Sequence, residues 1–276
     1  MSIPAQSIDR RARMDRRQVE PHPVTEDLAD ALTANAIELL FQPQFRGEDG
    51  ALAGAEALVR WEHPDHGLLA GDALVAISQS GGIARRLSRH IARAALREAA
   101  SWPDHLRLAI NVTAMDLFDR TFGEELLAMI ADVGFPVERL TLEITEQALV
   151  ADLDRSAARL EALAENGIRI ALDDFGAGFC NFRYLKVLPL HALKLDRGMI
   201  EGIASDPRDL AVLRGIVAMA RALELAVIAE GIETEEQRAV AMREGCDVWQ
   251  GFLGAKPMIP AQFAQLASQK AVSRPW

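Results

Sequence analysis

Cysteine, long apolar runs and positive charge are all scarce in this chain, and each scarcity excludes a class of protein. The two cysteines, Cys180 and Cys246, are too few for a disulfide framework or a zinc cluster. A formal net charge of −10 opposes binding to a nucleic-acid polymer. No apolar run is long enough to span a membrane, and the amino terminus lacks the apolar core of a secretory signal. We therefore expect a cytoplasmic protein without a membrane span.

The composition that remains is that of a globular protein. Hydrophobic residues make up 50% and charged residues 25% of the 276 positions, which allows a sizeable core. Residues 1–28 are polar, charged and interrupted by proline, so we expect a disordered or loosely helical tail there. The alternative is a helix that docks to a partner protein. Regular patterning starts at residue 29, and we place one folded domain at residues 29–270.

Within this domain, short apolar runs alternate with segments of helical spacing. The expected strands are 38–41, 52–59, 106–112, 140–144, 168–172, 192–195, 226–229 and 247–249. The expected helices include 84–100, 124–133, 152–165, 210–223 and 235–244. This alternation favours a closed α/β barrel, the TIM or (β/α)8 barrel. The connection at 45–51 is too short for a helical crossover, so we expect the first two strands to be antiparallel.

Polar side chains end nearly every expected strand. They are Glu56, Asn111, Glu143, Asp173, Asp174, Lys194, Asp196, Glu230 and Gln250. In a barrel of parallel strands, the carboxyl ends of the strands meet at one edge, where active sites are built. We therefore expect these side chains to converge on one site.

The acids and amides of this set offer oxygen ligands, which suit Mg²⁺ or Mn²⁺ better than zinc. If the chain bends where its strand ends, Asp173 and Asp174 both face the pocket, and one of them can bridge two ions. Two such ions can activate water and clamp a phosphodiester. Lys194 is expected to orient the attacking water or to stabilise the transition-state phosphate, with a structural ion pair as the alternative. Arg60 shares a strand face with Glu56 and is expected to bind phosphate.

Eight segments, in order along the chain, resemble the EAL domain family over residues 29–265. They read FQPQ, EALVRWEHP, AINVT, LEITE, ALDDFGAGF, LKLDR, IAEGIET and GCDVWQGFLGAKP. The resemblance implies a modified TIM barrel that hydrolyses the second messenger cyclic di-GMP to linear pGpG with two Mg²⁺ or Mn²⁺ ions. We expect Ca²⁺ to inhibit, because its longer and looser coordination suits in-line chemistry poorly. The expected partners are cyclic di-GMP and a second copy of the chain, which forms a homodimer through the barrel.

The resemblance also implies a role for each site residue. The implied metal ligands are Glu56, Asn111, Glu143, Asp173, Asp174 and Glu230. Glu56, Glu230 and Lys194 are the implied catalytic residues, and Lys194 positions the water. The expected substrate-binding residues are Gln42, Arg60, Asp196 and Gln250. Glu146 and Cys180 are expected to control the loop that follows the two aspartates.

Two segments depart from the usual family sequence. The loop that usually reads DDFGTGYSS reads DDFGAGFCN here, which removes hydroxyl groups and puts Cys180 in place of a serine. The usual QGYLFSRP reads QGFLGAKP, so Gly254 replaces an aromatic that commonly lies near the guanine. Two other functions stay open: an EAL domain that binds cyclic di-GMP or a partner protein without hydrolysis, and an enolase-like lyase with a lysine base. The complete set of metal-site acids favours hydrolysis.

Overall fold

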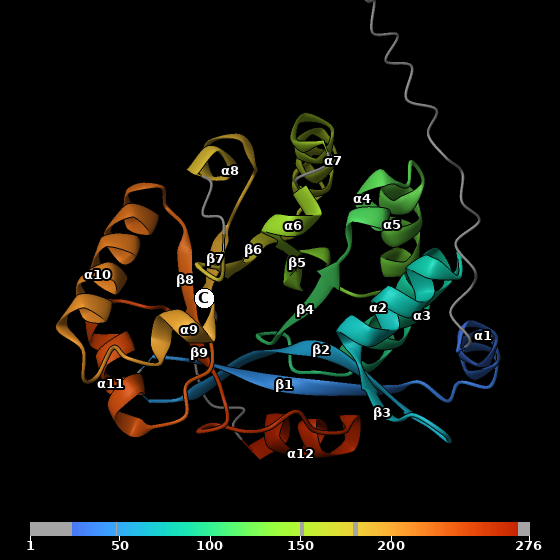
Figure 1. Cartoon of the computed structure of the whole chain (residues 1–276), viewed down its shortest axis with the longest axis horizontal. Helices are drawn as coiled ribbons and strands as arrows, with labels where there is room; N and C mark the ends of the chain where they lie inside the picture. The colour runs from blue at the N-terminus through green and yellow to red at the C-terminus, as the bar shows by residue number, and fades with distance from the viewer. Residues whose placement is uncertain (1–23, 48, 150–151, 179–181, 270–276) are drawn as a thin grey trace, which may run out of the picture.

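The computed structural model describes residues 24–47, 49–149, 152–178 and 182–269. Its centre is a closed barrel of eight strands, with a ninth strand, β3, paired to β2 at its edge (Figure 1). The strands are β1 (Glu38–Arg46), β2 (Ala51–His63), β3 (Gly67–Ala70), β4 (Arg107–Val112), β5 (Leu140–Thr145), β6 (Arg169–Phe175), β7 (Ala192–Leu195), β8 (Ala226–Ala229) and β9 (Val248–Gln250).

The order of the strands around the barrel confirms the expected architecture. They follow β1, β2, β4, β5, β6, β7, β8 and β9, and β9 returns to β1. β1 is antiparallel to both β2 and β9, whereas the remaining neighbours in the barrel are parallel. β1 continues to Arg46 and β2 begins at Ala51, so the connection between them is shorter than expected. Gly47 and Gly50 turn the chain there, each with φ of 62°.

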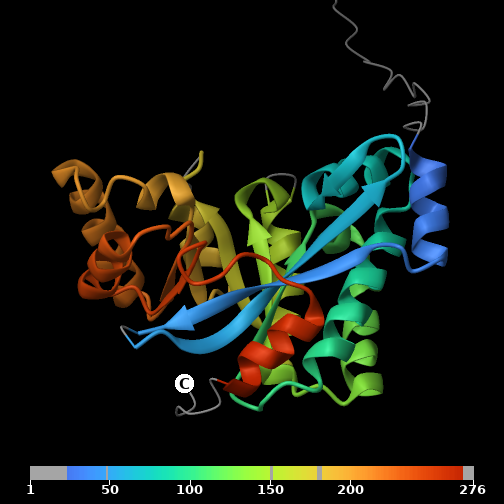
Figure 2. The same ribbon diagram turned by 90° about the horizontal axis from the view of Figure 1, so that it is seen from below.

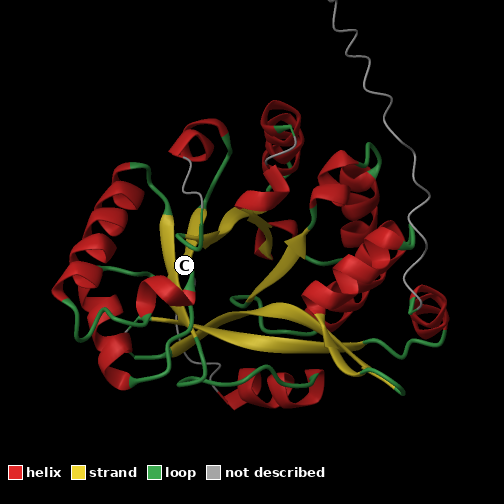
Figure 3. Ribbon diagram, viewed as in Figure 1, coloured by secondary structure: helices red, strands yellow, loops and turns green. Residues whose placement is uncertain are grey.

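Helices cover the outside of the barrel (Figure 3). They are α1 (Thr25–Thr33), α2 (Gly71–Ser80), α3 (Ala84–Ala99), α4 (Ala114–Phe118), α5 (Phe122–Val133), α6 (Glu146–Leu149), α7 (Leu153–Glu165), α8 (Phe182–Val187), α9 (Arg197–Ile200), α10 (Pro207–Ala222), α11 (Glu235–Glu244) and α12 (Pro260–Gln269), with a 3-10 turn at η1 (Val137–Arg139). α12 lies against β1 (Figure 2), where Phe263 packs on Phe41 and Trp102. Among the described helices, none has the length and apolarity needed to cross a membrane.

The folded part begins before the expected domain boundary. α1 starts at Thr25, and its Leu28 is fully buried in a second apolar cluster with Val59, Leu74 and Leu87. Residues 25–28, which we expected to belong to the tail, therefore form part of the fold. The rest of the expected tail, residues 1–23, lies outside the described residues. Helix α10 also starts earlier than expected, because Asp206 caps it and Pro207 suits its first position.

The inward faces of the barrel strands form three layers. Polar residues stand toward the mouth formed by the carboxyl ends of the parallel strands, on the inward faces that the period of two along each strand defines. A middle layer of small and apolar side chains includes Ala171, Ala192, Ile228 and Val248. Below this layer, at the amino-terminal ends, β4 and β6 start with arginines. The polar layer at the carboxyl ends is the candidate site.

Candidate active site

A buried lysine stands at the centre of four carboxylates. Only 1% of the Lys194 side chain is exposed, and its Nζ lies 2.7 Å from Glu230 Oε1 and 2.8 Å from Glu143 Oε2. Asp173 Oδ1 is 3.1 Å and Glu56 Oε2 3.4 Å from the same nitrogen. Burial alone would lower the pKa of Lys194, but the four carboxylates raise it well above its usual value. The lysine is therefore a firmly protonated cation.

One lysine cannot neutralise four carboxylates. Burial raises the pKa of Glu143 well above its usual range; Lys194 opposes the rise, and repulsion from the neighbouring carboxylates adds to it. Burial raises the pKa of Glu230 to about 8, with Asp173 and Glu56 adding to the rise. Glu143 Oε1 is buried and accepts no hydrogen bond from the described residues. The cluster thus has oxygens and negative charge to spare, which is what a divalent cation requires.

The carboxylates form two groups that share one residue. The first comprises Glu56, Glu143 and Asp173, and the second comprises Asp173, Asp174 and Glu230. Within each group the ligand oxygens lie within 4.8 Å of one another, so each group could hold a metal ion. The two groups would hold two ions and share Asp173, since hard cations such as Mg²⁺ take carboxylate oxygens.

An irregularity in β6 brings Asp173 and Asp174 to the same end of the barrel. The pairing between β6 and β7 shifts between Leu172 and Phe175, and Asp174 has a left-handed φ of 54°. In a regular strand, neighbouring side chains would point to opposite faces. The Asp174 amide donates to Asp173 Oδ1 at 2.9 Å, which stabilises the bend. Burial and the charge of Asp173 raise the pKa of Asp174.

Amide side chains hold Glu56 in place. Asn111 Nδ2 donates to Glu56 Oε1 at 2.7 Å, and Gln250 Nε2 donates to Glu56 Oε2 at 2.8 Å. Burial raises the pKa of Glu56, but Lys194 and these hydrogen bonds outweigh it, so the pKa lies below its usual value. Gln44 Nε2 in turn donates to Gln250 Oε1 at 3.0 Å. Glu56 is thus the carboxylate of the cluster that is anchored as an anion.

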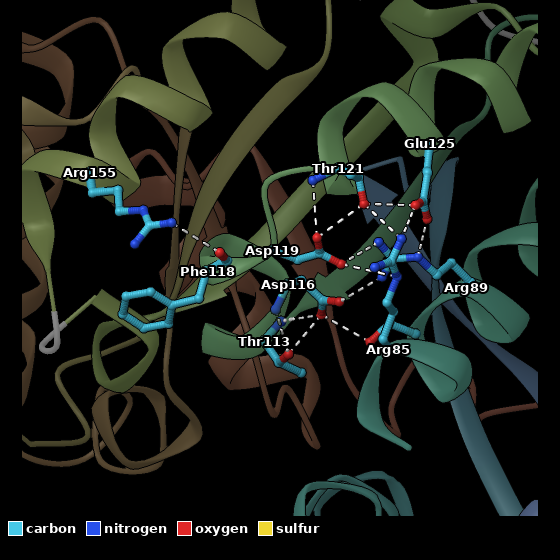
Figure 4. A network of polar contacts seen from close by, with 10 residues as sticks. Arg85, Arg89, Thr113, Asp116, Phe118, Asp119, Thr121, Glu125 and Arg155 are labelled. Carbon is cyan, nitrogen blue, oxygen red and sulfur yellow. Dashed lines mark hydrogen bonds and ion pairs between the residues drawn. The ribbon is translucent and has the colours of Figure 1, made fainter. Parts of the chain in front are cut away.

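The chain that follows Asn111 is fixed by a polar network between helices (Figure 4). Thr113 caps α4 in a reciprocal capping box with Asp116. Arg89 of α3 donates to Asp119 at 2.8 Å and also pairs with Glu125 of α5. These contacts tie the end of β4, and with it Asn111, to two helices on the outside of the barrel.

Comparison with known proteins gives the family. The family profile described as EAL domain matches residues 25–257. The chain is 37% identical over 237 residues to cyclic di-GMP phosphodiesterase NbdA of Pseudomonas aeruginosa, a match that covers 84% of this chain and 30% of that protein. This chain belongs to the EAL domain family. It is also 34% identical over 253 residues to cyclic di-GMP phosphodiesterase PA2567 of the same organism, covering 90% of this chain and 43% of that protein. The chain thus spans less than half the length of these two curated relatives.

The fold of this EAL domain agrees with a solved structure named "PaMucR Phosphodiesterase, c-di-GMP complex". The two superpose with a TM-score of 0.81 at 34% sequence identity. The match covers 87% of this chain and 99% of the other chain.

The structure gathers the expected metal residues but leaves other expected site residues outside the cluster. Arg60 donates to the backbone carbonyl of Val59 at 2.8 Å, four residues along β2 from Glu56. Such a separation is roughly 13 Å along a strand, which suits contact with a more distant part of a ligand. Gln42 is half-buried and pairs with Glu56 across the two strands. Asp196 caps α9 through the amide of Gly198 at 2.9 Å.

Glu146 and Cys180 were expected to control the loop that follows the two aspartates. Glu146 is half-buried at the start of α6, directly after β5. Cys180, its expected partner, lies outside the described residues. The role of this pair in controlling the loop therefore stays a prediction.

Gln44 and Gly254 belong to this region, and the sequence indicated their roles only in part. The period of two along FQPQ puts Gln44 on the face of Gln42, a signal that could have identified it.

A Cβ atom on Gly254 would lie 2.3 Å from the ring of Phe45 and 2.8 Å from that of Trp249. Those rings stack 4.7 Å apart. An aromatic at position 254 is thus incompatible with this pair as it packs here.

Proposed function

We propose that this EAL domain hydrolyses cyclic di-GMP to linear pGpG in a reaction that depends on Mg²⁺ or Mn²⁺. The observation that carries the proposal is the pair of carboxylate groups that share Asp173 and surround a buried lysine. The names of NbdA and PA2567 and the cyclic di-GMP complex of PaMucR support the choice of substrate. Hydrolysis adds water to one phosphorus atom and releases the 3′ oxygen, so the product keeps a 5′ phosphate.

The residues present fit two divalent cations. We assign Glu56, Asn111, Glu143 and Asp173 to one ion and Asp173, Asp174 and Glu230 to the other. When bound, the ions supply Lewis-acid activation of water and neutralise charge on the phosphodiester. Their oxygen ligands favour Mg²⁺ or Mn²⁺, and we expect Ca²⁺ to occupy the same ligands without supporting turnover.

The chain's own side chains position the reactants. Lys194 Nζ lies among the carboxylates, where it can donate hydrogen bonds to the attacking water or to a phosphate oxygen. Gln250 and Asn111 hold Glu56 as an anion in a fixed orientation. Arg60 and Gln42, on the strands next to the cluster, are assigned to the dinucleotide, where the guanidinium fork suits a phosphate. Asp196 is assigned to the same ligand, although its visible contact is the cap of α9.

The adjacent Asp173 and Asp174, together with Arg60, argue against the enolase-like alternative, because they suit a phosphodiester better. A lyase of that type takes a proton from carbon with a lysine that is neutral near pH 7. Lys194 instead contacts four carboxylates. The cluster serves charge stabilisation better than proton abstraction.

The test is incubation of the purified chain with cyclic di-GMP and Mg²⁺, followed by chromatography of the products. We expect pGpG with Mg²⁺ or Mn²⁺, and no product when a chelator is added or when Ca²⁺ replaces Mg²⁺. Binding of cyclic di-GMP without any turnover at saturating metal would refute hydrolysis and favour the receptor function. Lys194→Met serves as the inactive control, since it removes the central cation.

A further inference from the structure

At its carboxyl end, β4 pairs with only one neighbouring strand. The ladder between β2 and β4 ends at Ile110, whereas the ladder between β4 and β5 continues through Asn111 and Val112. The Asn111 side chain donates through Nδ2 to Glu56 Oε1 at 2.7 Å, which leaves its Oδ1 to bind a cation. The position of Asn111 therefore depends on how the chain directly after β4 is fixed.

Asp116 of α4 is a buried carboxylate that fixes this chain. Only 2% of the residue is exposed. Its Oδ2 accepts hydrogen bonds from the backbone amide of Thr113 at 3.0 Å and from the Thr113 hydroxyl at 2.7 Å. The same oxygen accepts from the Ser88 hydroxyl of α3 at 3.0 Å. A single carboxylate oxygen thus joins the residue two positions after Asn111 to a helix on the outside of the barrel.

Arg89 of α3 supplies the counter-charge and braces α4 (Figure 4). Its Nη1 lies 3.8 Å from Asp116 Oδ1, and its Nη2 lies 2.8 Å from Asp119 Oδ2. Its Nε also pairs with Glu125 of α5. Only 15% of the Arg89 side chain is exposed, so salt screens these pairs less than pairs at the surface. Asp116 is therefore held between α3 and α5 with its charge compensated.

We propose that Asp116 is a positioning residue for the metal site, which fixes Thr113 and thereby the place of Asn111. The proposal rests on the proposed function, because it takes Asn111 as a ligand of the first ion. Residues behind metal ligands orient those ligands, and their loss typically weakens metal binding roughly 10- to 100-fold. Asp116 acts through the backbone between Thr113 and Asn111. Its loss should therefore lower the metal affinity and leave the affinity for the dinucleotide at saturating metal unchanged.

The experiment measures Mn²⁺ binding to the whole metal-free chain by calorimetry, while NMR follows the side-chain amide of Asn111. Asp116→Ala should weaken Mn²⁺ binding roughly tenfold and shift the Asn111 amide resonances before any metal is added. Thr113→Ala removes one hydrogen bond to Asp116 and should cause a smaller loss, whereas Thr113→Ser keeps the hydroxyl and should match the wild type. In the rate assay, Asp116→Ala should raise the Mg²⁺ concentration for half-maximal rate, with KM for cyclic di-GMP at saturating Mg²⁺ unchanged.

A helix cap elsewhere in the chain separates positioning from a general loss of stability. Asp206 caps α10 by accepting from the Arg208 amide at 2.7 Å. Asp206→Ala also removes a capping carboxylate, and it should leave Mn²⁺ binding and the Asn111 resonances unchanged. Equal Mn²⁺ affinities for Asp116→Ala and Asp206→Ala would overturn the proposal. If Asp116→Ala does not fold, equal affinities for Thr113→Ala and Thr113→Ser would overturn it too.

Metal binding and turnover together distinguish this proposal from the proposed function. Mn²⁺ affinities that differ among the variants as expected, in a chain that leaves cyclic di-GMP intact, would support the positioning role and refute hydrolysis. Hydrolysis by the wild type, with the same Mn²⁺ affinity in Asp116→Ala as in the wild type, would support the proposed function and refute the positioning role.

Discussion

Replacing Glu230 by glutamine should stabilise the metal-free protein at alkaline pH, although it removes a residue of the proposed active site. Burial raises the pKa of Glu230 from 4.5 to about 8, and repulsion from Asp173 and Glu56 adds to the rise. The folded protein therefore binds this proton more tightly than the unfolded chain does. The stabilisation that follows is complete below pH 4.5 and is lost as the pH rises through about 8. Glutamine cannot ionise, so it avoids that loss.

The magnitude follows from the difference between the two pKa values of Glu230. From 4.5 to about 8, at roughly 1.4 kcal/mol for each pH unit, the ceiling is about 5 kcal/mol. The measurable effect is smaller, because Glu143 titrates in the same cluster and takes up part of the proton affinity. We expect Glu230→Gln to exceed the wild type by roughly 2–4 kcal/mol in free energy of unfolding at pH 9. Mg²⁺ should then stabilise the wild type more than the variant, because it neutralises the same charge.

The assay is urea unfolding in chelator at pH 5 and pH 9, compared among the wild type, Glu230→Gln and Glu161→Gln. Glu161 is exposed on α7, so its variant controls for the loss of one negative charge. The difference between Glu230→Gln and the wild type should be small at pH 5 and large at pH 9. A Glu230→Gln protein that is no more stable than the wild type at pH 9 would refute the reasoning.

Three further predictions concern catalysis, substrate binding and packing. Glu56→Ala should abolish hydrolysis while circular dichroism still shows a folded barrel, and an unfolded variant would make Glu56 structural. Arg60→Ala should raise KM for cyclic di-GMP by roughly 10- to 100-fold, with the Mg²⁺ concentration for half-maximal rate unchanged; the reverse pattern would exclude a phosphate contact. Gly254→Ala should cost about 1–3 kcal/mol in urea unfolding, because its Cβ would meet the rings of Phe45 and Trp249; an unchanged midpoint would show that the rings move freely.

The barrel could be predicted from the sequence, because its strands are apolar runs separated by clear helical segments. The sequence was insufficient for α1 and β3, which are short and lie next to strongly polar segments. α2 and α12 were also not predicted. These elements are stabilised mainly by packing against the barrel, which single-sequence periodicity does not report.

The site was predictable where chemistry and strand period coincide. Glu143, Lys194 and Glu230 lie near the carboxyl ends of parallel strands, which bring such positions together whatever the loops do. Glu56 was expected to end its strand but lies in the middle of β2, which continues to His63. The turn that lets Asp174 join them depends on a left-handed backbone conformation, which the sequence allows but does not require. Three expectations concern what lies outside this chain and stay predictions. They are the homodimer, a partner for the amino-terminal tail and the location in the cell.

The charge balance of the cluster is the strongest argument for catalysis over simple binding. Burial, with added repulsion among the carboxylates, raises the pKa values of Glu143 and Glu230, so the metal-free fold carries an electrostatic cost at neutral pH. A domain that only held cyclic di-GMP would gain from neutral side chains there, because its ligand is itself an anion. Two divalent ions would neutralise the charge of the carboxylates, and the ions would then attract the phosphodiester. An arrangement that is unfavourable without cations and suited to a phosphodiester with them is what hydrolysis at two metal ions requires.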